Sequence, residues 1–350
     1  MKAPVIALAA LSVACMVSGT EVVRGATLTE PEWGAYKQHF LDPSGRIVDT
    51  GNGGISHSEG QGYGLMLAYL AGRPDDFERI WTFTRTEMLL RDDGLSVWKW
   101  VPGAGSHTPD LNNATDGDLL IAYALWSAGK AWQRPDYLAL GRTIATAIAE
   151  HCVVTWKGRP YLLPGASGFT AEDRPDNSPV VNPSYWVFAA LPAMTELLPS
   201  PLWKALGDSG VALIDESEFG RRRLPSEWVS LGPEHHFMAD GFPPEFGYNS
   251  IRIPLYLIGG GITDPERLKR LKAGMTADDG NPAVFDLAGD RVRASLSEPG
   301  YRMVVDLAAC AIDGSRLSEP SRTFTPTLYY PSTLQLLGLA IAREKYPKCL

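Results

Sequence analysis

The sequence has only four cysteines among its 350 residues, and it lacks the spaced cysteine and histidine pairs that bind zinc. Of its six histidines, His235 and His236 are merely adjacent, a spacing that does not suit two ligands on one helix. We therefore expect no metal site and no cofactor. Cys152, Cys310 and Cys349 are far apart and odd in number, so we interpret them as small buried apolar side chains rather than as a disulfide framework.

Basic residues are outnumbered: 32 Lys and Arg stand against 40 Asp and Glu, which gives a net charge of −8. A chain with this balance has little attraction for a phosphate backbone, so nucleic acid is not an expected partner. The 35 glycines and 27 prolines follow no Gly-X-Y period, which excludes a collagen-like chain. A hydrophobic content of 45% is enough to build a large core, which argues against intrinsic disorder.

Long apolar runs are also scarce. The one that stands out covers residues 3–17, after Lys2 and before a zone of small residues that includes Gly19. This order is typical of a secretory signal peptide, which we assign to residues 1–26, with Gly19 and Ala26 as alternative cleavage positions. The run is shorter than the ~20 residues of a membrane span, so no stable membrane insertion is expected. The prediction is a secreted or periplasmic protein.

Beyond the signal, apolar residues recur mostly at helical spacing, between short loops rich in Gly, Pro, Asp and Asn, and predict about eleven helices. The expected helices lie near residues 29–41, 58–71, 74–90, 116–128, 134–150, 183–198, 201–214, 248–259, 264–273, 298–311 and 329–343. Strand-like runs, such as 153–156 and 161–163, are few. No linker divides the chain and helix pairs recur along it. We therefore expect an all-α fold, one domain over residues 27–350 built as a barrel of paired helices.

Polar residues crowd the starts of several expected helices, first at residues 58–64. There Ser58 and Gln61 have the spacing of a capping box, and Glu59 is an acid in the first turn. Three glycines within residues 60–64 are costly in a helix. Their presence indicates a close approach to the backbone, with Glu59 held beside a ligand.

Two further clusters have the same character. In residues 112–118, Thr115 or Asp116 can fill the N-cap position, which leaves Asp118 facing the opening turn. In residues 243–254, Arg252 is surrounded by apolar neighbours. A buried Arg needs an acidic or carbonyl partner, so we expect it to pair with a carboxylate from another helix start.

Aromatic side chains gather at the same loop-to-helix junctions. Trp98 and Trp100 alternate in a short segment, Tyr185 follows Asn-Pro-Ser, and Tyr329 and Tyr330 open the last expected helix. Most aromatic residues of the chain must serve the core. Those that share a rim with the acids are candidate stacking platforms for sugar rings.

Four of these segments together resemble glycoside hydrolase family 8. They are Ser-Glu-Gly-Gln-Gly-Tyr-Gly at 58–64, Asn-Ala-Thr-Asp-Gly-Asp at 113–118, Asn-Pro-Ser-Tyr at 182–185 and Gly-Tyr-Asn-Ser-Ile-Arg-Ile-Pro at 247–254. The resemblance is greatest to the endo-β-1,4-glucanases associated with bacterial cellulose synthesis. It implies an (α/α)6 barrel and an inverting hydrolase, whose long cleft crosses the N-terminal ends of the helices.

The resemblance also implies roles for particular residues. Glu59 would be the general acid that protonates the departing glycosidic oxygen, and Asp116 would hold the distorted sugar at the cleavage point. Asn249 stands where many relatives have the catalytic base, an Asp. The side chains expected to contact substrate or to support the attacking water are Trp100, Tyr185, Tyr248, Arg252 and Tyr330.

The amide at position 249 is a departure from the family pattern. Inversion needs a second carboxylate ~6.5 to 9.5 Å from the acid. Asn249 can orient a water by hydrogen bonding, but its amide is not basic at neutral pH. Asp116 is the leading substitute base, with Asp240 and Glu245 behind it.

The expected function is inverting hydrolysis of internal bonds in a cellulose-type glucan. The expected partners are a β-1,4-linked polysaccharide and the cellulose synthesis and export machinery. A glucan-binding accessory protein with weak catalysis stays open, because of Asn249. A chitosanase, a xylanase or a mixed-linkage glucanase stays open too, since the family includes them.

Overall fold

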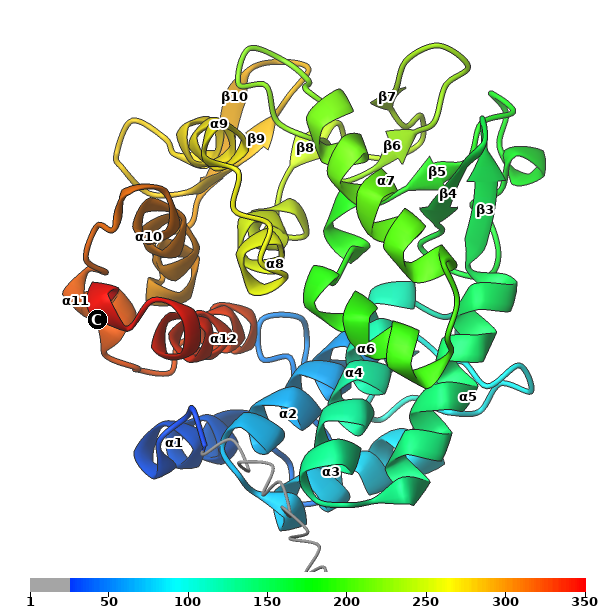
Figure 1. Ribbon diagram of the computed structural model, residues 1–350, viewed down its shortest axis with the longest axis vertical. Coiled ribbons are helices and arrows are strands. Elements are labelled where there is room, and N and C mark those ends of the chain that lie inside the picture. The colour runs from blue at the N-terminus through cyan, green and yellow to red at the C-terminus, as the bar shows by residue number, and fades with distance from the viewer. Residues whose placement is uncertain (1–25) are drawn as a thin grey trace, which may run out of the picture.

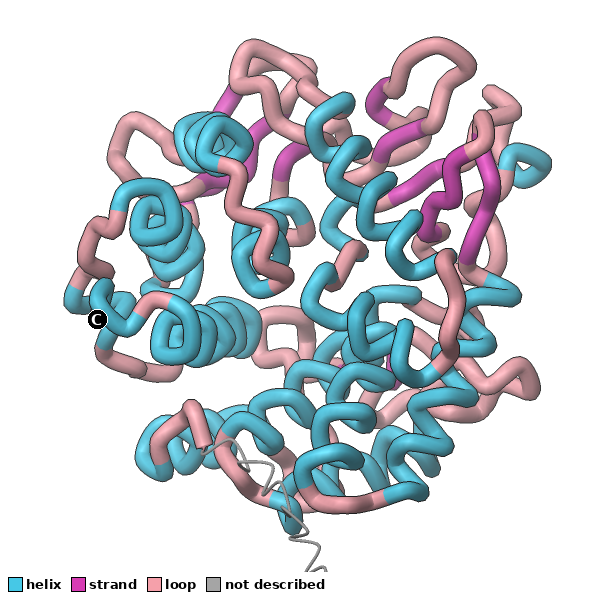
Figure 2. Tube along the Cα trace, in the orientation of Figure 1, coloured by secondary structure: helices cyan, strands magenta, loops and turns pink. Residues whose placement is uncertain are grey.

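The computed structural model describes residues 26–350, and this part of the chain is mostly helical (Figures 1 and 2). The predicted signal peptide lies outside the described residues, except for residue 26. Helices in the described range are α1 Glu30–Phe40, α2 Ser58–Leu70, α3 Pro74–Glu87, α4 Thr115–Ala131, α5 Pro135–His151, α6 Leu191–Leu197, α7 Leu202–Glu216, α8 Ile253–Gly259, α9 Pro265–Met275, α10 Pro299–Asp313, α11 Glu319–Arg322 and α12 Tyr329–Lys345. Among these helices none combines the length and the apolar composition that a membrane crossing requires.

The even-numbered helices follow one another around a closed ring (Figure 1). α2 packs on α4, α4 on α6, α8 on α10, α10 on α12, and α12 returns to α2. The 3-10 turn Phe188–Ala190 contacts both α6 and α8 and so joins the two halves of the ring. α1, α3, α5, α7 and α9 lie outside, each against an inner neighbour.

Inner and outer helices bury different shares of their surface. In α2, ten of thirteen residues are buried, because the helix is covered on nearly every side. The outer helix α3 buries only Phe77, Ile80, Trp81, Phe83 and Thr84, which form one face. In this pair a helix that is buried nearly all round packs against one with a single apolar stripe.

Nine of the eleven predicted helices are confirmed in position, two are broken, and the short helix α11 was not predicted. α1 begins after the N-cap Thr29, as expected, and Thr29 forms a capping box with Glu32. The helix expected over residues 183–198 is broken into 3-10 turns before α6, and the one over 248–259 becomes a 3-10 turn, Ser250–Arg252, before α8. Pro192 and Pro254 explain both breaks, since proline has no N–H to donate to the carbonyl four residues earlier and so occupies the first turn of each helix.

The strands are short, and they lie within the loops at one end of the ring. They are β1 Ser56–His57, β2 Lys99–Trp100, β3 Val153–Trp156, β4 Arg159–Leu162, β5 Val180–Val181, β6 Val229–Ser230, β7 Phe237–Met238, β8 Glu245–Phe246, β9 Ala283–Asp286 and β10 Arg291–Ser295. β3 and β4 pair close to where strand-like runs were predicted, whereas the β9–β10 hairpin was not predicted. The backbone N–H of Glu227 donates to the carbonyl of Glu245 at 2.8 Å, which ties the segment before β6 to β8.

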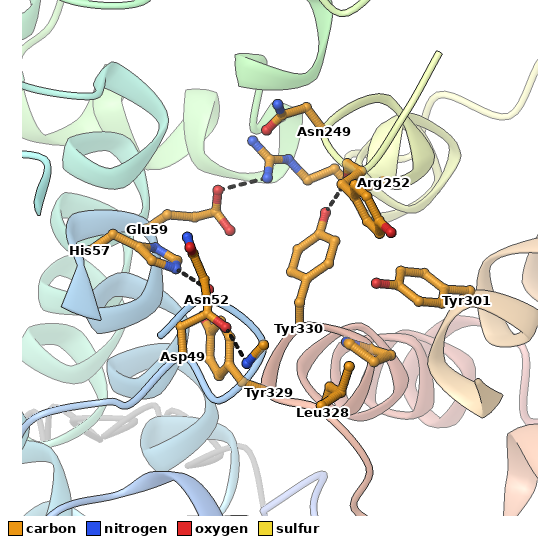
Figure 3. A pocket seen from close by; sticks show the side chains of 13 residues that line it. Asp49, Asn52, His57, Glu59, Asn249, Arg252, Tyr301, Leu328, Tyr329 and Tyr330 are labelled. Carbon is orange, nitrogen blue, oxygen red and sulfur yellow. Dashed lines mark hydrogen bonds and ion pairs between the residues drawn. The ribbon is translucent and has the colours of Figure 1, made fainter. Parts of the chain in front are cut away.

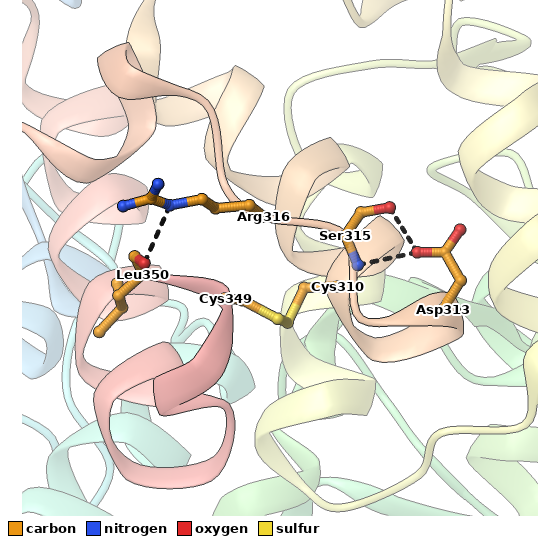
Figure 4. Close-up of a disulfide and its surroundings, with 6 residues drawn as sticks. All are labelled: Cys310, Asp313, Ser315, Arg316, Cys349 and Leu350. Carbon is orange, nitrogen blue, oxygen red and sulfur yellow. Dashed lines mark hydrogen bonds between the residues drawn. A yellow bond between two sulfur atoms is a disulfide. The ribbon is translucent and has the colours of Figure 1, made fainter.

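The cysteine interpretation is wrong for two residues. Cys310 in α10 and Cys349 after α12 form a disulfide with a Cα–Cα distance of 6.1 Å (Figure 4). Cys152 is free and buried, as expected. The two bonded residues are 39 positions apart, a separation that carries no pairing signal, and only the packing of α10 against α12 brings them together.

Replacing Cys310 with Ser is expected to lower the stability of the protein and to leave its chemistry intact. The disulfide closes a loop of 39 residues. Without this crosslink the unfolded chain gains conformational entropy, which in the chain-entropy model lowers the free energy of unfolding by roughly 3 to 4 kcal/mol. Denaturant unfolding of the oxidised protein, with and without a thiol reductant, measures the effect. Reductant should destabilise the parent but not the Cys310→Ser variant, and Cys152→Ser should remain sensitive to it. Equal stability of parent and Cys310→Ser would contradict the prediction.

Candidate active site

The N-terminal ends of α2, α8 and α12 and the loops before them enclose a cavity of about 450 Å³ (Figure 3). It is lined by Asp49, Gly51, Asn52, His57, Glu59, Tyr248, Asn249, Arg252, Tyr301, Leu328, Tyr329, Tyr330 and Pro331. Glu59, Tyr248, Asn249, Arg252 and Tyr330 were expected at the site from the sequence, and the structure brings them together. Asp49, Asn52, His57 and Tyr301 were missed. Asp49 and Asn52 lie in a loop without a periodic pattern, His57 lies in the two-residue strand β1, and Tyr301 lies in α10, where its apolar ring fits the pattern of a core residue.

Glu59 lies in the first turn of α2, with its side chain 15% exposed toward the cavity. The predicted capping box is wrong. The N-cap is His57, whose Nδ1 accepts from the backbone N–H of Gly60 at 3.0 Å. Gln61 turns inward instead, and its side chain bonds the backbone N–H of Ile47 and the hydroxyl of Thr84. A buried hydrogen-bonding partner outweighs the local cap here.

The glycines of α2 and α4 allow the two helices to approach closely. A Cβ at Gly62 would lie 2.5 Å from the Cβ of Leu120, and one at Gly117 would lie 2.7 Å from the backbone nitrogen of Glu59. The predicted close approach to the backbone of residues 60–64 is confirmed, and at Gly62 the neighbour that approaches is helix α4. This close contact between the two helices fixes the position of Glu59 relative to α4.

Arg252 is the centre of the charged cluster. Its Nη1 donates to Glu59 Oε2 at 2.7 Å, and its Nη2 donates to Asp116 Oδ2 at 2.5 Å. The side chain is 1% exposed, and its Nε donates to the carbonyl of Ser184. The prediction that a buried Arg pairs with carboxylates from other helix starts is confirmed, and the partners are the first turns of α2 and α4.

Asp116 is the second residue of α4, since the N-cap is Ala114 and neither Thr115 nor Asp116 caps the helix. One carboxylate oxygen accepts from the N–H of Gly117 at 2.8 Å, and the other binds Arg252. Burial raises the pKa of Asp116, Arg252 lowers it, and the nearby Glu59 carboxyl raises it further, with a net upward shift. The side chain is 1% exposed, so it is better placed to hold a partner than to exchange protons with water.

Asp118 does not reach the cavity. Its carboxylate accepts from the backbone N–H of Ser96 at 2.9 Å, from the Ser96 hydroxyl at 2.7 Å and from Asn113 Nδ2 at 2.9 Å. Burial raises its pKa to about 6, and these donors partly oppose the shift. Asp118 therefore anchors the loop that leads into α4.

His57 and Asp49 form a second charged contact on the cavity wall, with 3.3 Å between Nε2 and Oδ2. Burial alone would lower the pKa of His57, but the carboxylates of Asp49 and Glu59 outweigh it and raise the pKa. Since Nδ1 accepts from Gly60, the ring proton that faces Asp49 lies on Nε2. Figure 3 shows His57 beside Glu59 on the α2 side of the cavity.

Asn249 is held by a carboxylate that sequence reasoning missed. Its backbone N–H donates to Glu227 Oε1 at 2.7 Å, and its side-chain Nδ2 donates to Glu227 Oε2 at 3.0 Å. The two reserve candidates lie elsewhere: Asp240 is exposed outside the cavity lining, and Glu245 lies 3.9 Å from Arg293. The 22 positions between Glu227 and Asn249 gave no signal of this contact.

The expected aromatic residues are spread over several places. Tyr248, which is 51% exposed, and Tyr330 line the cavity, and the Tyr330 hydroxyl donates to the Tyr248 carbonyl at 2.9 Å. Tyr185 lies behind them, with the Arg252 guanidinium 5.8 Å from its ring centre. Trp100 is outside the cavity lining, and its ring is stacked on His107 at 4.3 Å. Within residues 26–350, no group of three or more His, Cys, Asp or Glu is arranged to hold a metal ion.

Comparison with known proteins identifies the class of enzyme. The family model described as glycosyl hydrolases family 8 matches residues 4–344. Since the match spans nearly the whole chain, the protein belongs to this family, and the resemblance noted from its motifs is confirmed.

Individual relatives agree with this assignment. The sequence is 37% identical over 319 residues to a probable endoglucanase of Novacetimonas hansenii, which covers 89% of this chain and 91% of that protein. The structure is similar to the endo-beta-1,4-glucanase CMCax from Acetobacter xylinum, with a TM-score of 0.79 and 36% identity over 90% of this chain and 97% of that one. It is also similar to endoglucanase Cel10 from Klebsiella pneumoniae, with a TM-score of 0.80 and 31% identity over 90% of this chain and 100% of that one.

Proposed function

We propose that the protein is an endo-β-1,4-glucanase that hydrolyses internal bonds of a cellulose-type glucan with inversion. The observation that carries the proposal is the position of Glu59, partly exposed in a cavity and hydrogen-bonded to Arg252. The six inner helices in a ring, with outer helices packed against them, support an (α/α)6 barrel, the fold that the family resemblance implies. The relatives with endoglucanase activity in their names support the substrate.

The proposed chemistry uses Glu59 as the proton donor and Asn249 as the residue that orients the attacking water. Glu59, as a carboxylic acid, gives its proton to the glycosidic oxygen as the bond to the sugar C1 breaks. Arg252 and Asp116 hold Glu59 from behind, because Arg252 bridges both carboxyl groups. Asn249 orients the attacking water on the opposite face of the ring through its amide oxygen.

Substrate contacts are assigned to aromatic side chains around the cavity. The exposed ring of Tyr248 and the neighbouring Tyr330 offer apolar faces with hydroxyl edges, which suit a glucose ring. Tyr185 supports Arg252, and Trp100 would act only if a longer chain reached the recess beside His107.

The finer assignments concern the setting of the enzyme. We propose that residues 1–26 direct export, that residues 27–350 form a single catalytic domain, and that the protein is secreted or periplasmic. We further propose that it acts beside a bacterial cellulose synthesis and export machinery, with β-1,4-glucan as its partner.

A substrate panel tests the function. Carboxymethyl cellulose, cello-oligosaccharides, chitosan, xylan and mixed-linkage glucan are each incubated with the purified chain, and new reducing ends are measured. NMR of the first product gives the anomeric configuration. We expect the highest rate on β-1,4-glucan, with α-anomeric products. Preferential cleavage of chitosan or xylan would reject the substrate assignment.

Asn249 is the specific observation that favours a second function. An amide at the position of the family base suits a glucan-binding accessory protein that cleaves slowly. Tight binding of cello-oligosaccharides with no reducing-end release would favour this alternative over the first.

A further inference from the structure

The site as described has a proton donor but no obvious proton acceptor. An inverting hydrolase must remove a proton from the attacking water, and an amide such as Asn249 is not basic enough to keep it. Asp116, the leading substitute, is unsuited to this task, because both of its oxygens are engaged and it is 1% exposed. Asp240 is exposed outside the cavity lining, and Glu245 is directed toward Arg293.

Glu227 is the carboxylate in direct contact with Asn249. Its two oxygens accept from the backbone N–H and from Nδ2 of Asn249, at 2.7 and 3.0 Å. A carboxylate only accepts hydrogen bonds, so the amide NH₂ must face Glu227 and the amide oxygen must face away. Within residues 26–350 this oxygen, Oδ1, accepts no hydrogen bond, and Asn249 lines the cavity. In the view of Figure 3 Asn249 and Glu59 lie on opposite sides of the Arg252 guanidinium.

The chain makes room for this contact at one position. A Cβ on Gly247 would lie 2.7 Å from Glu227 Oε1, so any larger residue there would displace the carboxylate. The segment that carries Glu227 is tied to β8, which ends directly before Gly247, by the backbone bond from Glu227 to Glu245. Two chain segments are thus joined at the point where Glu227 reaches Asn249.

Glu227 is 7% exposed, and it is surrounded by few charges. The groups that face it are Glu245, Arg252, Tyr185 and Tyr330. Burial raises the pKa of Glu227, Asn249 and Arg252 lower it, Glu245 raises it, and the net shift is upward. A carboxylate with a raised pKa is a stronger base than an ordinary Glu.

We propose that Glu227 is the terminal proton acceptor of the hydrolytic step and that the amide of Asn249 relays the proton to it from the attacking water. The proposal rests on the proposed function, glucan hydrolysis with inversion, and names the base that it needs.

The water oxygen forms a bond to the sugar C1 as the bond from C1 to the leaving oxygen breaks, and Glu59 gives that oxygen its proton. One water proton moves to Asn249 Oδ1 while Nδ2 passes a proton to Glu227 Oε2. This leaves Asn249 briefly as its imidic acid tautomer and Glu227 protonated. Return of the Oδ1 proton to solvent, return of the Glu227 proton to Nδ2 and uptake of a proton from solvent by Glu59 restore all three side chains.

The first test is Glu227→Gln, which keeps the size of the side chain and removes its basicity. We expect kcat on cello-oligosaccharides to fall by about 100-fold or more, as for loss of a general base, with binding changed less than about threefold. In the parent, kcat/KM should decrease as pH falls through a pKa above that of an ordinary Glu, and this acid limb should disappear in the variant. Glu227→Asp, which retains a carboxylate, should keep the limb and part of the activity.

The decisive test restores a base where the family usually has one. Asn249→Asp places a carboxylate at the water but next to Glu227, and two adjacent carboxylates share a proton. The double variant Asn249→Asp/Glu227→Gln removes that conflict. We therefore expect its kcat to be at least about tenfold higher than that of Glu227→Gln. In the double variant the new amide at position 227 can donate to the new carboxylate at position 249, so the contact between the two side chains is rebuilt. The pH profile therefore separates the two roles, because a merely structural Glu227 would leave the acid limb in place in Glu227→Gln.

Glu245→Gln is the matched control, since Glu245 is a carboxylate on the same pair of segments and should keep most of the activity. Near-parental kcat in Glu227→Gln, or a folded double variant without recovery, would overturn the proposal. An active parent combined with either result leaves glucan hydrolysis standing and removes only Glu227. A parent that binds oligosaccharide but releases no reducing ends rejects the proposed function itself, and the base assignment with it.

Discussion

Replacing Glu59 with Gln is expected to abolish hydrolysis of carboxymethyl cellulose while the protein stays folded. The amide cannot give a proton to the glycosidic oxygen, and general acid catalysis contributes about 10² to 10⁴ in rate. Arg252 Nη1 can still donate to the amide oxygen, so the contact at 2.7 Å has a replacement. Reducing-end assays of parent and variant, with circular dichroism and oligosaccharide binding measured on both, give the result.

The role of Glu59 as acid has a specific control. In an aryl cello-oligosaccharide made from a strongly acidic phenol, the phenolate departs without being protonated. Glu59→Gln should therefore lose much less rate on this substrate than on cellulose derivatives. Asp116→Asn, which alters the other partner of Arg252, should show no such difference between the two substrates. Near-normal turnover of carboxymethyl cellulose by Glu59→Gln would remove Glu59 from the mechanism.

Most helices could be predicted from the sequence, because their apolar residues follow one period over three or more turns. The breaks at Pro192 and Pro254 were not predicted, since an apolar pattern continues through them. Caps were also missed at α2 and α4. Ser58 and Thr115 have the right chemistry for a cap, but both are buried between packed helices. Tertiary packing decided the local conformation there.

The residues of the candidate site also differ in whether the sequence could predict their contacts. Arg252 could be predicted to pair with acids, because an Arg in an apolar run has few other ways to be buried. Glu227 could not, since the contact with Asn249 depends on β6 and β8, which are only two residues long. The disulfide between Cys310 and Cys349 depends likewise on helix packing. Contacts made by loops and by distant segments are those that periodicity does not encode.

The second large effect is expected on removing the guanidinium that holds the two acids. Arg252→Met leaves Asp116, 1% exposed, without its cation, and breaking a buried ion pair in this way costs about 3 to 5 kcal/mol. Hydrolysis should be lost too, since Glu59 loses its contact with Nη1. Arg252→Lys should recover part of the stability but little activity, because a single ammonium cannot span two carboxylates as a planar guanidinium does.

The stability loss in Arg252→Met should depend on pH in a defined direction. Burial raises the pKa of Asp116 already in the parent, and Arg252 opposes that shift. Without Arg252 the pKa of folded Asp116 rises further above its unfolded value, so the protonated side chain is tolerated and the ionised one is not. The variant should therefore be most stable at acidic pH and lose stability as pH rises toward and through the raised pKa. Urea unfolding at mildly acidic and at neutral pH measures this difference, and Arg252→Met/Asp116→Asn should abolish most of it. A variant whose stability is the same at both pH values would show that Asp116 is not the charge that Arg252 neutralises.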